Sequence, residues 1–230
     1  GSLFRGGRYI DGYGLTESCS GDTLMEAGRE IEKIGSTGRA MPHVEIQVRD
    51  DAGQALPAGE AGEICLRGPK VTNGYWRDVE KTAASFHSGQ WFRTGDVGYL
   101  DGEGFLYLTD RKKDMIISGG ENIASSEVER VLSQLPQGLE AAAVGLPDER
   151  WGERVVAVVV LREGGTLTLD ELQAHCKGKL GGFKLPKQLV LRDSLPRLPS
   201  GKVLKRVLRA ELTSTRSATW SWISQVRLPW

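Results

Sequence analysis

Residues 94–123 read TGDVGYLDGEGFLYLTDRKKDMIISGGENI, and this stretch decides how the chain is organised. It joins a Thr-Gly-Asp turn, a hairpin, a run of basic residues and a Gly-Gly pair. A fold alone has little need for that combination, whereas a binding site with a moving part would use each piece. Asp101-Gly102-Glu103-Gly104 separates two apolar runs, which is a strong hairpin signal. The sequence therefore predicts strands over 97–100 and 105–109, and a change of architecture after Asp110.

The segment before Asp110 has the pattern of β-structure with many turns. Residues 44–49, VEIQVR, alternate apolar and polar side chains, which indicates a half-buried strand. Residues 63–67, EICLR, form a second such run between glycines. We therefore expect a β-rich, distorted-barrel-like fold in this part of the chain.

The segment after Asp110 alternates strand and helix patterns. The expected elements are a strand at 115–117, a helix at 126–134, strands at 141–146 and 155–161, a helix after Thr168 ending at Gly181-Gly182, a strand at 188–191 and a helix at 203–212. Ser126 with Glu129, and Thr168 with Glu171, have the spacing of capping boxes. Such alternation predicts a small α+β domain. We expect domains at 1–111 and 112–212, followed by an atypical tail.

Composition excludes several classes of protein. A chain of 230 residues holds one large or two small domains, and its 30 basic and 30 acidic residues cancel. No broad charge favours nucleic acid, and no apolar run reaches the length of a membrane span or a secretory signal. The three cysteines have no CxxC spacing, so a disulfide framework or zinc site is not expected. A reducing cytoplasm fits this cysteine usage best.

The tail from 213 to 230 differs from the rest of the chain. It has no acidic residue and contains Trp220, Trp222 and Trp230, half of the six tryptophans. It is either a docking peptide or sequence foreign to the fold. We favour the second interpretation, because nothing upstream prepares a site for three tryptophans.

Two short stretches have residue types suited to a nucleotide. Tyr13-Gly14-Leu15-Thr16-Glu17 offers a ring for a base, a hydroxyl for a phosphate and a carboxylate for Mg²⁺. Asp96, after Thr94-Gly95, can accept hydrogen bonds from the two vicinal hydroxyls of a ribose. Taken singly, the first stretch is a weak signal that a turn would also explain, and for Asp96 alone a β-turn is the preferred interpretation.

Two further stretches place lysines in loops. Gly201-Lys202 precedes a helix, where a positive charge opposes the helix dipole, and this mismatch slightly favours a functional lysine. Phe183 beside Lys184 and Lys187 could receive the adenine and phosphates of coenzyme A. Solvated lysines at a strand entrance explain the second pattern equally well.

Five motifs occur in order: YGLTE, GEICLRGPKVTNGYW, WFRTGD, DRKKDMIISGGENI and PRLPSGK. Together they resemble the ANL superfamily of adenylate-forming enzymes, in particular the AMP-forming acyl-CoA synthetases that activate fatty acids. The resemblance extends from Tyr9 to Leu212. Five ordered motifs are far more specific than any one of them.

The resemblance implies a role for each matching residue. For the nucleotide, Tyr13 and Gly14 would lie against adenine, Thr16 would contact the phosphates, Glu17 would help hold Mg²⁺, and Asp96 and Arg111 would bind the ribose. Lys113 would be the hinge between the two domains, and Lys202 would bridge the carboxylate and the α-phosphate. Ser118, Gly119 and Gly120 would line the channel for the pantetheine arm. The implied substrates are ATP, a small carboxylic acid and coenzyme A. The implied reaction forms an acyl-adenylate and then a thioester.

One element of the family pattern is missing. These enzymes carry a Ser/Thr/Gly-rich phosphate loop upstream of YGLTE, and no such loop is present in this sequence. The chain therefore resembles the C-terminal part of a longer enzyme: a remnant of the large domain followed by a small mobile domain. We expect it to be inactive alone. Two alternatives stay open, a ligase that loads a carrier protein and a non-catalytic nucleotide-binding module.

Overall fold

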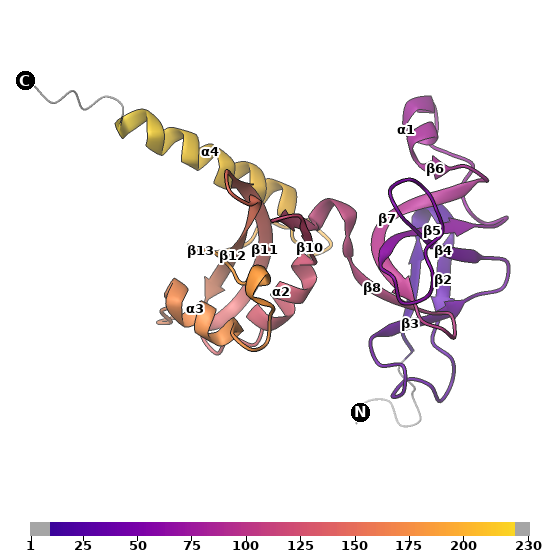
Figure 1. Ribbon diagram of the computed structural model, residues 1–230, viewed down its shortest axis with the longest axis horizontal. Helices are drawn as coiled ribbons and strands as arrows, with labels where there is room; N and C mark the ends of the chain where they lie inside the picture. The colour runs from indigo at the N-terminus through magenta and orange to yellow at the C-terminus, as the bar shows by residue number, and fades with distance from the viewer. Residues whose placement is uncertain (1–9, 224–230) are drawn as a thin grey trace, which may run out of the picture. The chain divides into compact units, whose positions relative to one another are not determined.

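The computed structural model describes residues 10–223, with side chains placed as far as Ser214. The chain divides into two units between Lys113 and Asp114. In Figure 1 strands make up most of the first unit, whereas the second mixes strands with longer helices. The predicted α+β class is confirmed. No helix among the described residues has the length and hydropathy needed to cross a membrane.

The first unit is built on one antiparallel sheet of eight strands. These are β1 (Gly12–Leu15), β2 (Ser20–Leu24), β3 (Ser36–Ala40), β4 (Glu45–Arg49), β5 (Gly62–Arg67), β6 (Phe86–His87), β7 (Trp91–Leu100) and β8 (Phe105–Arg111). The strand order is β1-β2-β3-β8-β7-β5-β4, with β6 on β7. Because β1 and β4 end this path without pairing, the sheet is open rather than closed into the expected barrel. Three short helices accompany it: η1 (Thr16–Ser18), α1 (Val79–Ala84) and η2 (Lys112–Asp114).

Of the strands predicted from the sequence, β5, β7 and β8 lie inside this sheet, whereas β4 is its edge strand. Ile64 and Leu66 on β5 pack with Leu106 on β8 and Tyr13 on β1, all buried. The hairpin between β7 and β8 closes at Asp101, whose Oδ1 accepts the N–H groups of Glu103 and Phe105. This Asp turn is the local reason that the predicted hairpin forms here.

The first three strands were not expected, because their sequences are polar and rich in glycine. They are held by pairing rather than by an apolar face of their own. β1 approaches β2 so closely at Gly14 that a Cβ there would lie 1.9 Å from the carbonyl oxygen of Ser20. Only glycine fits this crossing, which brings the start of the YGLTE motif onto the sheet.

The second unit has a five-stranded sheet with helices on both faces. Its elements are β9 (Ile116–Ser118), β10 (Glu121–Ile123), α2 (Ser125–Leu132), β11 (Gly138–Asp148), β12 (Gly152–Leu161), α3 (Leu169–Cys176), η3 (Gly182–Lys184), β13 (Gln188–Arg192) and α4 (Lys205–Ile223). The order is β10-β9-β12-β11, and β13 pairs with β12 in parallel. Helices α2 and α3 cover one face and α4 lies on the other (Figure 1). Leu208 of α4 packs into the core on that second face.

Most expected elements of the second unit are confirmed, with three corrections at helix ends. The capping box at Thr168 and Glu171 is present. The one expected at Ser126 is wrong, because α2 starts after Ala124 without a side-chain cap. Helix α3 ends at Cys176, well before Gly181-Gly182.

The last helix also differs from the expectation. It begins at Lys205 and continues to Ile223, beyond the predicted end at 212. The side chains of Trp220 and Trp222 are outside the described part, as is all of Trp230. The two interpretations of the tail therefore stay predictions.

Candidate active site

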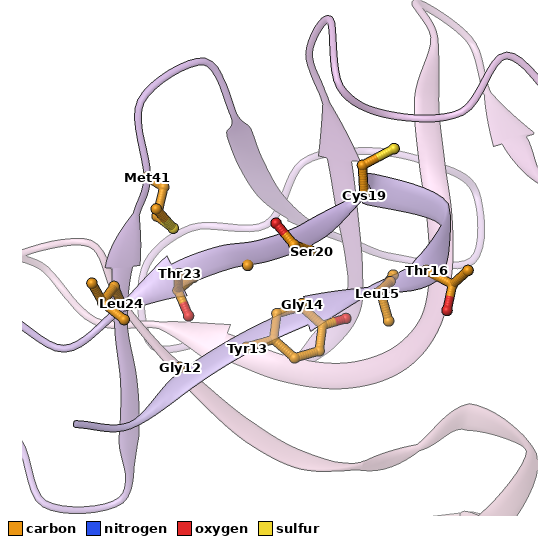
Figure 2. A pocket seen from close by; sticks show the side chains of 11 residues that line it. Gly12, Tyr13, Gly14, Leu15, Thr16, Cys19, Ser20, Thr23, Leu24 and Met41 are labelled. Carbon is orange, nitrogen blue, oxygen red and sulfur yellow. The ribbon is translucent and has the colours of Figure 1, made fainter. Parts of the chain in front are cut away.

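An open hollow of about 620 Å³ lies along β1 and β2. It is lined by Gly12, Tyr13, Gly14, Leu15, Thr16, Cys19, Ser20, Gly21, Thr23, Leu24 and Met41. Figure 2 shows the two strands side by side, with Thr16 and Cys19 at the turn that joins them. Three residues predicted from the sequence, Tyr13, Gly14 and Thr16, therefore line the same hollow. The glycines in its lining have no side chains that would fill it.

Tyr13, Asp96 and Arg111 are brought together by the sheet, although they are far apart in sequence. The Tyr13 hydroxyl donates a hydrogen bond to Asp96 Oδ2 at 2.8 Å. Arg111 Nε lies 3.1 Å from Asp96 Oδ1, because β7 and β8 pair these two residues directly. Asp96 is 6% exposed, and its backbone N–H donates to Thr94 Oγ1. A buried carboxylate is thus fixed on both oxygens beside the hollow.

Tyr13→Phe should lower the free energy of unfolding by about 1–3 kcal/mol, because Asp96 loses a donor in a buried site. Burial, with the charge of Asp96 adding to it, raises the pKa of Tyr13 above its ordinary value. Because the pKa of Tyr13 is higher in the folded protein than its value of about 10 in the unfolded chain, the contribution of Tyr13 to stability is complete below about pH 10. It is lost as the pH rises above about 10, where the unfolded chain releases the proton first. Urea unfolding should therefore show a smaller difference in the free energy of unfolding between wild type and Tyr13→Phe at pH 11 than at pH 7. A difference independent of pH would contradict this.

Thr16 and Glu17 follow β1 in the short helix η1. Thr16 is exposed, and Glu17 Oε1 accepts a hydrogen bond from the Tyr75 hydroxyl at 3.0 Å. The backbone carbonyl of Glu17 also accepts the N–H of Thr72 at 2.7 Å. Among the described residues no three potential metal ligands cluster. One oriented carboxylate still fits Mg²⁺, which usually takes one or two protein carboxylates and completes its shell with substrate phosphates and water.

Two residues that support this turn, Asp22 and Lys70, were not predicted from the sequence. Asp22 is fully buried, and its Oδ2 accepts a 2.5 Å hydrogen bond from Ser18 Oγ. Lys70 Nζ lies 3.1 Å from Asp22 Oδ1 and also donates to the carbonyl of Gly21. Lys70 and Tyr75 both belong to the GEICLRGPKVTNGYW motif. A lysine and an aromatic residue inside a turn-rich motif were the available signal.

Lys113, the candidate hinge, lies in η2 at the end of the first unit. The residue before it is firmly held: Lys112 Nζ lies 2.6 Å from Asp51 Oδ1 and 2.9 Å from Glu63 Oε2. Glu63 also accepts from Arg93 at 3.0 Å. These contacts attach Lys112 to the first sheet, and the chain divides immediately after Lys113.

In the second unit, Ser118, Gly119 and Gly120 form the tight turn between β9 and β10. Both glycines have positive φ, at 62° and 84°, so other residues would be strained there. The Gly119 N–H donates to the carbonyl of Trp151 at 2.7 Å, and a Cβ on Gly119 would come within 3.0 Å of the Trp151 ring. The turn therefore carries no side chain at its two glycines and is held in place by Trp151.

Phe183 and Lys184 lie in η3, on the way to β13. The Phe183 side chain is half exposed, and Lys184 Nζ lies 5.5 Å from the centre of its ring. Lys184 also pairs with Glu127 of α2 at 2.7 Å. Glu127 therefore partly neutralises the charge of Lys184, which leaves less positive charge to bind the phosphates of coenzyme A.

Lys202 lies in an ordered turn just before α4. Its carbonyl accepts the N–H of Leu198 at 2.9 Å, and Arg197 pairs with Val203 across the turn. Arg197 also pairs with Glu140 of β11 at 2.8 Å, and this contact ties the turn to the sheet. The backbone at Lys202 is therefore held on both sides while the residue itself is exposed.

The three cysteines differ in access. Cys19 is exposed and lines the hollow, whereas Cys65 and Cys176 are buried. Burial raises the pKa of the Cys65 thiol to about 12, and burial also raises that of Cys176.

Two protein-family models match this chain in order. The AMP-binding enzyme family matches residues 2–76, which include the hollow and the Glu17 turn. The AMP-binding enzyme C-terminal domain family matches residues 127–202, ending at Lys202.

Curated relatives include CoA ligases with different acids in their names. An indoleacetate–CoA ligase of Aromatoleum aromaticum is 46% identical over 205 residues, which are 89% of this chain and 40% of that protein. A long-chain-fatty-acid–CoA ligase of Mycobacterium tuberculosis is 42% identical over 206 residues, or 90% of this chain and 40% of that protein. The chain thus spans about two fifths of the length of these relatives.

Solved structures agree with the sequence relatives. O-succinylbenzoate CoA synthetase of Bacillus subtilis, in complex with its acyl-adenylate intermediate, is 40% identical with a TM-score of 0.81 over 87% of this chain and 40% of that one. The same enzyme in complex with ATP and magnesium ion has a TM-score of 0.78 at 40% identity, over 86% of this chain and 40% of that one. With both family models matched in order, this chain belongs to the AMP-binding enzymes of the adenylate-forming ANL superfamily.

Proposed function

We propose that the complete protein containing this chain is an AMP-forming acid–thiol ligase. It would activate a carboxylic acid with ATP and pass the acyl group to coenzyme A. The observation that carries this proposal is the buried Asp96 carboxylate, fixed by Tyr13 and Arg111 beside a hollow lined with glycine. Such a carboxylate suits two vicinal hydroxyls of a ribose, and the hollow, which its glycines leave unfilled, suits a flat base.

In the first half-reaction, the acid's carboxylate attacks the α-phosphorus of ATP, and pyrophosphate leaves. Asp96 with Arg111 would hold the ribose, and Thr16 would donate to a phosphate oxygen. Magnesium bound with the nucleotide would neutralise phosphate charge, with Glu17 as its protein ligand. Lys202 would supply positive charge where the carboxylate and α-phosphate meet. Chemistry of this kind depends mainly on positioning and charge.

In the second half-reaction, the thiol of coenzyme A displaces AMP and leaves the acyl group as a thioester. The turn at Ser118-Gly119-Gly120 would line the path of the pantetheine arm, because glycine lets backbone approach a thin ligand. Lys113 is proposed as the pivot that exchanges this turn for Lys202 between the two steps. Its place at the division between the units supports that role.

The direct test is exchange of labelled pyrophosphate into ATP, dependent on added acid. It is made on the complete protein that contains these 230 residues. Acid-dependent exchange followed by thioester formation with coenzyme A is expected. Nucleotide binding without exchange for any acid would favour the non-catalytic module instead.

The acyl substrate and the acceptor are finer parts of the proposal. We favour a fatty acid, although the relatives named for indoleacetate and succinylbenzoate make aryl acids the necessary comparison. A panel of fatty and aromatic acids in the exchange assay ranks them by kcat/KM. Comparing the rate of acyl transfer to free coenzyme A with the rate of transfer to a phosphopantetheinyl carrier protein identifies the acceptor. Because all three cysteines are free thiols, the cytoplasm is the proposed compartment.

Lys184→Ala and Lys187→Ala should each raise the KM for coenzyme A, by about tenfold for a lost contact between a lysine and a phosphate. The KM for ATP should not change, because neither lysine is assigned to the nucleotide. Glu127→Gln is the matched control: it removes the partner that neutralises Lys184, so the KM for coenzyme A should fall. Unchanged values in all three variants would identify ordinary solvated lysines.

A further inference from the structure

We infer that Glu63 is a positioning residue that confines the pivot of the proposed ligase to Lys113. It would do so by fixing Lys112 and the Asp96 turn to the same strand. This inference rests on the proposed two-step function.

Glu63 stands near the start of β5 and is almost wholly buried, with a side chain 4% exposed. Its Oε2 accepts from Lys112 Nζ at 2.9 Å and from Arg93 at 3.0 Å. Its Oε1 accepts the backbone N–H of Gly95 at 3.3 Å. One carboxylate therefore contacts the residue before the candidate hinge and the turn before Asp96.

The charges of this group favour a persistent contact. Burial alone would raise the pKa of Glu63, but hydrogen bonds from Lys112 and Arg93 outweigh burial and keep that pKa below its ordinary value. The pKa of Lys112 is raised, because its bonds to Asp51 and Glu63 outweigh its own desolvation. Both partners are thus ionised at neutral pH. Because Glu63 itself is buried, pulling Lys112 away would leave a buried carboxylate with one partner fewer, which is costly.

The consequence is mechanical. A rotation that began at Arg111 or Lys112 would have to pull Lys112 away from two carboxylates and disturb the pairing of Arg111 with Asp96. A rotation that begins at Lys113 disturbs neither. The anchor would keep the ribose contacts intact while the second unit changes orientation, so both orientations would be reached about one defined point.

The first test is limited trypsin digestion of this chain, with cleavage after Lys112 identified by mass spectrometry. Lys112 must leave its carboxylates to enter the protease. Glu63→Gln should therefore speed cleavage after Lys112 by about tenfold, the equivalent of one hydrogen bond between charged groups. Glu45→Gln on the neighbouring strand removes an exposed carboxylate paired with Arg67 and should leave that rate unchanged. An equal rate in wild type and Glu63→Gln would overturn the anchor.

The second test measures the two half-reactions in the complete ligase. Glu63→Gln should lower the rate of both by about tenfold, because fewer molecules hold the second unit in a productive orientation. The KM for ATP should change less than twofold, since Asp96 keeps Tyr13 and Arg111. A general loss of folding would instead lower the fraction of active enzyme, which active-site titration measures, and leave the rate per active molecule unchanged.

A double-mutant cycle joins the two residues. Lys112→Gln should reproduce the kcat loss, and the double variant Glu63→Gln with Lys112→Gln should be no slower than either single variant. Lys112→Arg, which keeps the charge, should recover most of the rate lost in Lys112→Gln. Multiplied losses in the double variant would overturn the inference. A wild-type ligase without acid-dependent exchange would refute the proposed function instead, and the trypsin result would still decide the anchor.

Discussion

Replacing Lys202 with alanine should slow acyl-adenylate formation by about a hundredfold to a thousandfold, the usual cost of removing one group that stabilises charge in a transition state. Thioester formation from supplied acyl-adenylate should stay largely intact. The reason is that negative charge gathers between the carboxylate and the α-phosphate only in the first step. The measurement is single-turnover kinetics of the complete ligase, with each half-reaction followed separately.

The geometry of the Lys202 turn makes this contrast sharp. The turn is held by Leu198, by the pairing of Arg197 with Val203, and by the Arg197–Glu140 ion pair, none of which uses the Lys202 side chain. Lys202→Ala therefore keeps these three contacts of the turn. Lys177→Ala, another exposed lysine of the same unit, controls for loss of charge. Equal losses in both half-reactions would refute the assigned role.

Asp96→Asn should weaken AMP binding by about a hundredfold, as expected for losing one hydrogen bond to a charged acceptor and the charge that strengthens the other. The amide keeps the shape of the side chain, but only one of its two polar atoms can accept. Isothermal titration of AMP into the complete ligase measures the change. The KM for coenzyme A should stay the same, because that ligand is assigned to residues of the second unit.

Two controls separate ribose recognition from a damaged site. Glu60→Gln removes an exposed carboxylate of the same unit and should leave the affinity for AMP unchanged. Comparing AMP with its 2′,3′-dideoxy analogue tests the contact itself. Wild type should prefer AMP strongly, whereas Asp96→Asn should hardly distinguish the two. A variant that still prefers AMP would rule out Asp96 as the ribose ligand.

The parts of the fold that sequence analysis predicted are those with local signals. The β7–β8 hairpin follows from the Asp101 turn, and α3 starts at the capping box of Thr168 and Glu171. The expected capping box at Ser126 fails for a long-range reason. Glu129 instead binds Lys205 of α4 at 2.8 Å and the backbone N–H of Ala143, and sequence spacing cannot reveal such partners.

Strands β1 to β3 were missed for a related reason. Their sequences, such as GYGL and SGDTL, carry almost no apolar alternation, so pairing with neighbours decides their conformation. The open sheet follows from the same dependence, because barrel closure would need a partner for β1 that the first unit does not supply among its described residues.

The candidate site could be predicted as a set of residues but not as a geometry. Motif order singled out Tyr13 and Asp96, which are 83 positions apart, and the sheet brings the hydroxyl of one to the carboxylate of the other. No pattern indicated that Glu63 or Asp22 would be buried and paired. Acidic residues usually lie at the surface of a protein. Asp22 belongs to β2, a strand that the sequence did not predict, and the register of β5 with β7 places Glu63 opposite Val97.

The difference in exposure among the three cysteines allows one of them to be labelled selectively. Thiol reagents react with the thiolate, so the two buried thiols with raised pKa should react slowly near neutral pH. Cys19, exposed at the edge of the hollow, should take up a maleimide dye first. A single fluorophore could then be attached to the native sequence beside Thr16, where its emission would report when the hollow fills.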